Sequence, residues 1–446
     1  MSQQIKQEEV AQFALDEAKR LGCNDVSVLC AKSNDSQVRF ANNDITLVNN
    51  VRNITLEVYL SKGKKRIVGS SFNPTEDGIK RFLGNLVRSC EALPVSEDYV
   101  PLPVGPFRYK SHANFDPNVE DAPLVELVRQ AIDEAGRAGA LRASGSLNTE
   151  VTDLFMITSA SAQGADKQTQ ILLNIRAFAD DNSSGQGLSC ASYVNEFHPD
   201  RAGRKAGEYA KKSLGSKLVN EGKYDIVFSP TVVSNILPVA SSASAFAIES
   251  GNSFLVDKLG NKVAVDKLGV EDQGVYDRGL GGRVFDDEGM PTGTNEIVLH
   301  GSFLTMLHNS STAKKFGKEK STGNAGIIFP RPATIVFNEG DVSLDEMIRE
   351  TGDGLFVTNN WYTRFQNMQS GDYSTVPRDA AFRIEDGELG QPVAGFRLSD
   401  SIPRQLLNIE MISNEREWIK WWEVSTPTLA PYMMIKDVGV TRAVGS

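Results

Sequence analysis

DVSVLCAKSNDSQVRFANNDITLVNNVRNITLEVYLSKGKKRIVGSSF, residues 25–72, alternates apolar and polar side chains in short runs. Alternation with a period of two is typical of strands that bury one face. Asn, Asp, Ser and Gly separate four runs, at 25–32, 36–43, 53–62 and 64–72, and these residue types favour turns. The segment therefore predicts an antiparallel meander of four short strands.

Helices are expected on both sides of this meander. Residues 7–22 space their apolar side chains three and four apart, as an amphipathic helix does. Residues 75–93 begin with a threonine N-cap and acidic residues in the first turn. Two further helices are expected at 121–139 and 200–214. The proline-rich stretch 93–118 has no periodicity and predicts an extended connector.

The second half of the chain is richer in turns and strand-like runs, including GLFVTNNWYTRF at 354–365 and LLNIEMIS at 406–413. SLDE at 343–346 has the form of a capping box that opens a short helix. We therefore expect an α+β fold. It has an N-terminal α/β-type domain with an antiparallel sheet and helices, residues 1–215, and a C-terminal β-rich domain with a barrel-like mixed sheet, residues 216–446.

Length, charge and composition limit the functional classes. A chain of 446 residues exceeds the usual span of one hydrophobic core, which favours two domains. The net charge is -10 and no run of Lys or Arg is longer than GKKR at 63–66, so direct nucleic-acid binding is not expected. No run of 18 apolar residues and no signal-peptide pattern is present, so we expect a cytoplasmic protein without a membrane partner.

The four cysteines and four histidines do not form a recognisable metal motif. No two cysteines have C-x-x-C spacing, and no two histidines have a helical metal-ligand spacing. Buried free thiols are the simplest interpretation of the cysteines.

SPTVVSNILPVASSASAFAIESG, residues 229–251, has the start of a helix but no titratable side chain before its end. Ser229 can cap the helix and Pro230 suits its first position. Pro238 removes a main-chain donor, so the helix either kinks or restarts there. The small side chains that follow favour close packing against another backbone, and a tightly packed helix is the simplest explanation.

WIKWW at 418–422 concentrates three tryptophans. If the segment is helical, Trp418 and Trp422 stand at positions i and i+4. If it is extended, Trp418 and Trp422 share one face, and Ile419 and Trp421 the other. Such a group is usually core and less often a partner surface.

Several ordered motifs give the chain a resemblance to a known family. They are YDIVFSP (224–230), SGNSFLVDKLGNKVA (250–264), VFDDEGMPTGTNEIVLHGSFLTMLHNSSTAKKFG (284–317), STGNAG (321–326), GLFVTNNWYTRF (354–365) and IKDVGV (435–440). In this order they resemble the TldD/PmbA (TldE) family of metallopeptidase subunits, most closely the TldE/PmbA branch.

The resemblance implies where a zinc site would lie. TldD members are expected to carry H-E-x-x-x-H on the helix of residues 229–251, and a cysteine ligand in the C-terminal half. In this chain the six motif positions hold Pro238, Val239, Ala240, Ser241, Ser242 and Ala243. No cysteine follows Cys190. Because catalytic zinc needs three protein ligands, Pro238, Val239 and Ala243 mark a degenerate motif, and no catalytic or metal-ligating residue is expected.

The TldE branch lacks this motif and is expected to pair with an active TldD subunit. The resemblance thus implies a non-catalytic, TldE-like pseudoenzyme in a TldD/TldE-type zinc metallopeptidase complex that degrades or matures peptides. This chain would shape the chamber and bind peptide, and zinc would lie in the TldD-like partner of the heterodimer, with no cofactor in this chain. The small helix face would accept the partner or a neighbouring strand, and a homodimer of the isolated chain is left open.

Candidates for a peptide-binding groove come from the shared motifs. They are Asp286, His308, Asn309 and Asn324. The turn of Asp286, Asp287 and Glu288 offers three carboxylates to a hard cation, but it lacks D-x-D-x-D-G spacing, and a solvated acidic turn is the favoured interpretation.

Two alternatives from other functional classes stay open. One is a stand-alone metallopeptidase with a non-standard metal site around Asp286, Asp287 and His308. The other is a regulator related to DNA gyrase, because the family has an older description as a gyrase modulator. The acidic balance then favours an indirect effect through a degraded peptide.

Overall fold

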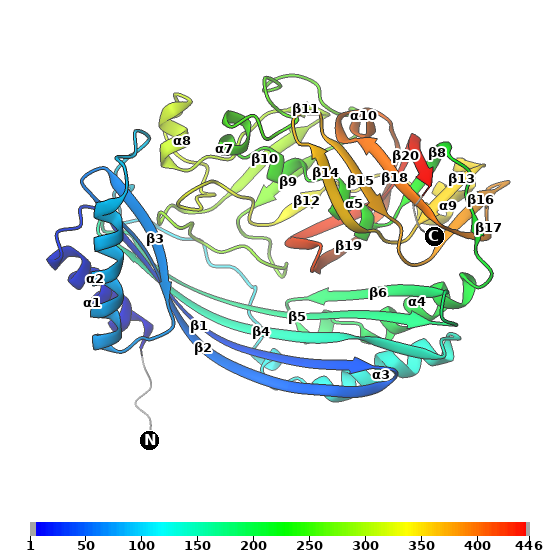
Figure 1. Ribbon diagram of the computed structural model, residues 1–446, viewed down its shortest axis with the longest axis horizontal. Helices are drawn as coiled ribbons and strands as arrows, with labels where there is room; N and C mark the ends of the chain where they lie inside the picture. The colour runs from blue at the N-terminus through cyan, green and yellow to red at the C-terminus, as the bar shows by residue number, and fades with distance from the viewer. Residues whose placement is uncertain (1–5, 443–446) are drawn as a thin grey trace.

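The computed structural model describes residues 6–442 and contains two β-sheets (Figure 1). The first sheet has six strands, all antiparallel to their neighbours, in the order β3-β2-β1-β4-β5-β6. Its strands are β1 (Val26–Ala41), β2 (Asp44–Lys62), β3 (Lys65–Ser71), β4 (Arg142–Thr158), β5 (Gln163–Phe178) and β6 (Ser184–Ala191). The long strands curve along the lower side of the molecule in Figure 1, beneath the C-terminal half.

The predicted four-strand meander is wrong in one respect, because its first two runs form the single strand β1. Asn34, in the expected turn, pairs with Arg52 on one side and Val151 on the other. Both backbone edges of β1 are therefore hydrogen-bonded through the polar segment, which outweighs the turn preference of its residues. The turn at 42–43 does form, and Asn42 and Asn43 both adopt positive φ.

The four helices that the sequence predicts all form, and they cover one face of this sheet. They are α1 (Gln7–Arg20), α2 (Glu76–Ala92), α3 (Leu124–Arg137) and α4 (Pro199–Lys212). Thr75 caps α2 by accepting a hydrogen bond from the Gly78 amide. The connector 93–116 is extended, and short 3-10 turns follow at η1 (Pro117–Val119) and η2 (Val194–Glu196).

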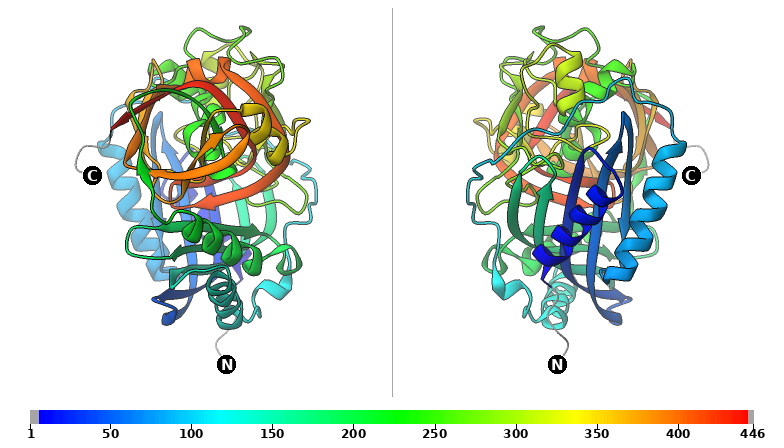
Figure 2. Two further views of the ribbon diagram at one scale, coloured as in Figure 1. Left: turned by 90° about the vertical axis from the view of Figure 1, so that its right-hand side faces the viewer. Right: turned by 90° about the vertical axis from the view of Figure 1, so that its left-hand side faces the viewer.

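The period of two in β1 shows which face the helices cover. Val26, Val28 and Cys30 lie in the core with α1 and α2, and Val38 and Phe40 lie in the core with α3 and α4. All five have even numbers, so both helix pairs cover the same face. The opposite face of the sheet points towards the C-terminal half (Figure 2).

The second sheet is large and mixed, with 14 strands among residues 217–442. Three of its pairings are parallel, β12 with β20, β13 with β8 and β17 with β7, and the sheet curves strongly (Figure 2). Its strands are β7 (Lys217–Leu218), β8 (Gly222–Phe228), β9 (Val270–Gln273), β10 (Thr294–Leu299), β11 (Ser302–Phe303), β12 (Ile335–Phe337), β13 (Gly354–Val357), β14 (Trp361–Asn367), β15 (Asp372–Val376), β16 (Ala381–Glu385), β17 (Glu388–Ala394), β18 (Phe396–Ser401), β19 (Ile409–Trp421) and β20 (Val424–Arg442). The expected α+β class, with an antiparallel N-terminal sheet and a large mixed C-terminal sheet, is confirmed.

Six short helices accompany the second sheet. They are α5 (Pro230–Ile236), α6 (Val239–Ser242), α7 (Ala245–Glu249), α8 (Ser310–Lys315), α9 (Leu344–Thr351) and α10 (Ile402–Leu407). The capping box at the start of α9 forms as predicted. The predicted strand at 406–413 is wrong at its beginning, because Leu406 and Leu407 close α10 and Leu406 is fully buried there.

The predicted domain boundary at 215/216 falls between α4 and β7. The division into two domains, residues 1–215 and residues 216–446, stays a prediction. No helix among residues 6–442 is long and apolar enough to cross a membrane.

Candidate functional site

The small-residue segment is three short helices rather than one. Ser229 caps α5 by accepting a hydrogen bond from the Val232 amide, and Pro230 stands at its start. Pro238 ends this first helix and is the N-cap of α6, so the expected restart at Pro238 occurs.

Three side chains of the segment 238–243 belong to the core of the C-terminal half, whereas Pro238 is half-buried and Ser241 is exposed. Val239, Ala240 and Ala243 are fully buried in the largest hydrophobic cluster. The Leu307 amide donates to the Ala243 carbonyl at 2.9 Å, and a segment of the same chain thereby covers this face. At Ala243 a segment of the same chain therefore lies against the helix, and the side chains of Val239 and Ala240 are also closed to solvent.

The acidic turn at 286–288 is buried, so the interpretation as a solvated turn is wrong. Asp286 is 2% exposed and Glu288 is 5% exposed. Asp286 accepts hydrogen bonds from the amides of Glu288, Met290 and Ala325 at 2.9–3.0 Å. Glu288 accepts from the Ser310 hydroxyl at 2.6 Å. Segments distant in the sequence thus supply the donors that let these carboxyl groups leave water.

Burial shifts the protonation of this turn. The pKa of Asp286 lies well above its ordinary value because the group is desolvated and faces Glu288. Burial also raises the pKa of Glu288, to about 7. Asp287 differs, because it forms ion pairs with Arg283 and Arg331. The turn therefore combines two buried carboxyl groups of raised pKa with one carboxylate that is paired with arginines.

Two adjoining cavities lie between the uncovered face of the first sheet and the C-terminal half, and we call them together the polar cleft. Their volumes are about 590 and 650 Å³. Glu150 and Ser425 line both cavities, so the two lie next to each other. Asp286 and Asn324 line the first cavity, so two of the four predicted groove residues face the polar cleft.

The floor of the polar cleft is the odd-numbered face of β1 and its neighbours. This face begins apolar, with Leu29 and Ala31 packed near Phe285, and turns polar at Asp35 and Gln37. The register places Gln37 beside Asn49 on one strand and Asn148 on the other. Amide side chains therefore form a cross-strand row.

Hydrogen bonds order this row and join it to β19. The Gln37 amide donates to the Asn148 oxygen at 2.6 Å. Gln170 donates to Glu150 and accepts from the Lys420 ammonium at 2.6 Å. None of these residues was predicted as a site residue, because only the strand register brings the polar runs SNDSQ (33–37) and NTEVT (148–152) side by side.

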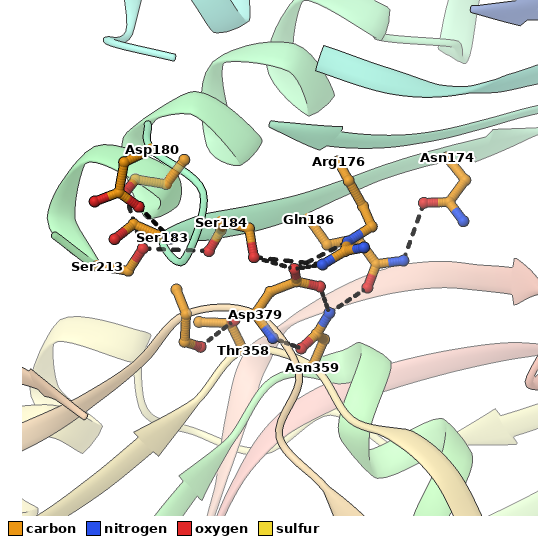
Figure 3. A network of polar contacts seen from close by, with 12 residues as sticks. Asn174, Arg176, Asp180, Ser183, Ser184, Gln186, Ser213, Thr358, Asn359 and Asp379 are labelled. Carbon is orange, nitrogen blue, oxygen red and sulfur yellow. Dashed lines mark hydrogen bonds and ion pairs between the residues drawn. The ribbon is translucent and has the colours of Figure 1, made fainter. Parts of the chain in front are cut away.

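A second polar network fixes the C-terminal half to the first sheet at the far end of the polar cleft (Figure 3). At its centre the Asp379 carboxylate is fully buried and accepts from Arg176 at 2.6 and 2.9 Å. The Ser184 hydroxyl donates to it at 2.6 Å, and the Asn359 amide donates to its second oxygen. Asn359 also donates to Gln186 at 2.7 Å. The network thus connects β5 and β6 with the loops that flank β14 and β16.

Residues 221–442 match the model of the PmbA/TldA metallopeptidase C-terminal domain. The chain belongs to the PmbA/TldD family.

Relatives of this family have low to moderate identity. A metalloprotease of Methanothermobacter thermautotrophicus is 27% identical over 316 residues, which cover 66% of this chain and 68% of the relative. The metalloprotease PmbA of Escherichia coli O157:H7 is 28% identical over 49% of this chain and 47% of its own length. The sequence match therefore spans about half of the length of PmbA.

Solved structures of PmbA/TldD-like folds match over nearly the whole chain. TldE from Thermococcus kodakarensis superposes with a TM-score of 0.86 at 17% identity, covering 97% of this chain and 99% of its own. A proposed modulator of DNA gyrase from Thermotoga maritima superposes with a TM-score of 0.85 at 21% identity, covering 97% of this chain and 100% of its own. At these identities the likeness shows a shared fold.

The PmbA/TldD family is one of zinc metallopeptidases, and the residues at 238–243 do not fit zinc. Pro, Val, Ala and Ser offer no imidazole, thiolate or carboxylate. Val239, Ala240 and Ala243 also leave no open position for a metal-bound water, since they are packed in the core. Among residues 6–442, no three His, Cys, Asp or Glu side chains are grouped to hold a metal ion.

The other two predicted groove residues lie outside the polar cleft. His308 is 2% exposed, and burial lowers its pKa to about 4. Asn309 is buried as the N-cap of α8, where it exchanges hydrogen bonds with Thr312 in a capping box. Both residues hold the start of α8, next to the Ser310 that binds Glu288.

Proposed function

We propose that this chain is a non-catalytic, TldE-like subunit of a two-component zinc metallopeptidase, and that it binds peptide in the polar cleft for a TldD-like partner. The observation that carries the proposal is the apolar packing of Val239, Ala240 and Ala243 at the motif positions. A helix that should aim metal ligands instead contributes Val239, Ala240 and Ala243 to the core. Zinc would then be bound by the partner.

The polar cleft supports the peptide-binding part of the proposal. Amide side chains such as Gln37 and Asn148 both donate and accept hydrogen bonds, as the peptide groups of an extended chain require. The two adjoining cavities give room for several residues of substrate. Clefts between domains are also the usual position of ligand sites.

A stand-alone metal site around Asp286, Asp287 and His308 has less support. Asp286 already accepts three main-chain hydrogen bonds, and Asp287 is neutralised by Arg283 and Arg331. These carboxylates would have to give up strong partners before they could bind a cation.

The similarity to proposed gyrase modulators fits an indirect effect. The net charge of -10 disfavours contact with DNA phosphates. We assign any effect on gyrase to peptide processing by the complex, and a salt-sensitive gel shift with duplex DNA would contradict that assignment.

The test is reconstitution with a TldD-like subunit. We expect the two chains to co-purify, and an unstructured peptide to be cleaved by the mixture but not by this chain alone. A blocking variant, Ser425→Trp, should fill the junction of the two cavities and lower cleavage without preventing co-purification. Ser216→Trp, at an exposed position outside the polar cleft, is the matched control. Cleavage by the isolated chain, or no complex at micromolar concentrations, would contradict the proposal.

A further inference from the structure

Four aromatic side chains gather where β14 begins and the turn after β19 starts, and we call them the aromatic platform. They are Trp361, Tyr362, Trp421 and Trp422. Their rings contact one another edge to face, with centroids 5.4–6.1 Å apart. Trp421 is buried, but Trp422 is 54% exposed and Tyr362 is 48% exposed. The predicted core role of the tryptophans therefore holds for Trp421 and not for Trp422.

The aromatic platform is rigidly supported. The Arg176 guanidinium lies 4.8 Å from the centre of the Trp361 ring, and the Asp379 network holds that guanidinium in place (Figure 3). Tyr362 has a φ of 58°, which is unfavourable for an aromatic residue, and its amide donates to Glu423 at 2.7 Å. Strained backbone of this kind persists where its surroundings fix it, and it concentrates at binding sites.

The aromatic platform also borders the polar cleft. Trp421 and Trp422 line the second cavity together with Gln37, Asn49 and Asn148. Trp421 is buried, with 7% of its surface exposed, and its indole N–H has no acceptor among residues 6–442. Buried donors of this kind normally have a partner. This nitrogen is itself buried, so the cavity is lined by the ring of Trp421 and not by its N–H.

We propose that the aromatic platform is a specificity subsite for a flat, apolar ring, that of an aromatic or proline side chain, in an extended peptide bound along the amide row. This inference deepens the proposed function and rests on it. Exposed aromatic faces bind such rings by stacking and edge contacts. The amides beside them bind main chain of any sequence, so the aromatic platform would supply the selectivity.

The test uses the full chain and fluorescein-labelled peptides that share a Gly/Ser/Asn host sequence. One guest position holds Phe, Pro, Leu, Arg or Ala, and fluorescence anisotropy gives each Kd. We expect the Phe and Pro guests to bind about five- to tenfold more tightly than the Ala host. Trp422→Ala should abolish this preference, so that the Phe, Pro and Ala guests bind that variant with similar Kd values, and Trp422→Phe should retain most of the preference.

Phe72→Ala is the matched control, since Phe72 is exposed outside both cavities. Circular dichroism of each variant confirms that the fold is intact. Binding of all peptides with equal affinity, the tightest binding by the Arg guest, or an unchanged Phe preference in Trp422→Ala would overturn the subsite and leave the proposed function standing. No binding of any peptide, alone or with the TldD-like subunit, would overturn both.

Discussion

Removal of the Asp379 carboxylate should destabilise the protein strongly. In Asp379→Ala, Arg176 loses two charge-assisted hydrogen bonds, and Ser184 and Asn359 lose an acceptor. Loss of one partner from a buried ion pair costs about 3–5 kcal/mol, because the other charge is left uncompensated. The Arg176 side chain is 22% exposed and keeps its contact with Trp361, so we expect the lower end, ~3 kcal/mol.

The assay is equilibrium unfolding in urea, followed by both tryptophan fluorescence and circular dichroism. Coincident curves justify a two-state free energy of unfolding. Asp181→Ala is the matched control, because the Asp181 side chain is 96% exposed and its ion pair with Arg142 is long, at 3.5 Å. We expect that control to change stability by less than ~0.5 kcal/mol.

A double variant separates the ion pair from simple packing loss. In Arg176→Met with Asp379→Ala no buried charge remains, so the combined destabilisation should be smaller than the sum of the two single effects. A loss below ~1 kcal/mol for Asp379→Ala, or strict additivity in the double variant, would refute the assignment of Asp379 as the centre of this junction.

Three further predictions test the core, the acidic turn and the sheet. Ala243→His should lower stability by ~1–3 kcal/mol, since position 243 is fully buried, and a neutral effect on the melting temperature would contradict the packed helix. Glu288 keeps its proton in the folded chain up to about pH 7 but releases it above about pH 4.5 when unfolded, so its contribution is complete below pH 4.5 and is lost as the pH rises through 7. The unfolding free energy of the protein relative to Glu288→Gln should therefore fall by about 3 kcal/mol from pH 4.5 to 7.5. The lowered pKa of His308 makes stability rise with pH, but His308 is present in both proteins and does not change this difference. A difference that stays constant across the pH range would refute the raised pKa of Glu288. Gly187→Ala should destabilise by ~3 kcal/mol, because a Cβ there would lie 2.0 Å from the Ala202 carbonyl oxygen, whereas Gly84→Ala, with open space in a helix, should stabilise by ~0.5–1 kcal/mol; similar melting temperatures for the two variants would contradict the tight contact of α4 with β6.

Local signals in the sequence were sufficient to predict where several helices begin. Thr75, Ser229 and Ser343 cap the helices that they were predicted to cap, because an N-cap depends on residues two or three positions away. Pro238 stops a helix for the same local reason, namely the donor that proline lacks.

Structural features that depend on residues distant in the chain could not be predicted from one sequence. The turn at Asp286 and Glu288 has the composition of a surface loop, and only contacts with Ala325 and Ser310 bury it. Likewise β1 continues through Asn34 because strands on both sides pair with it. Burial is a tertiary property, so a polar run can form part of an ordered strand.

The candidate site was only partly predictable, because tertiary contacts bring most of its residues together. Asp286 and Asn324 were selected from motifs and do line the polar cleft. Gln37, Asn148 and Lys420 were missed, because they come from strands separated by more than 100 residues and only the register brings them together.

Zinc content of the purified chain, expressed without a TldD-like subunit and measured by mass spectrometry after dialysis, tests the central claim most directly. Pro238, Val239 and Ala243 give zinc no ligand, and we predict a strongly substoichiometric content. About one tightly held zinc ion per chain would contradict the account of this protein as the non-catalytic subunit.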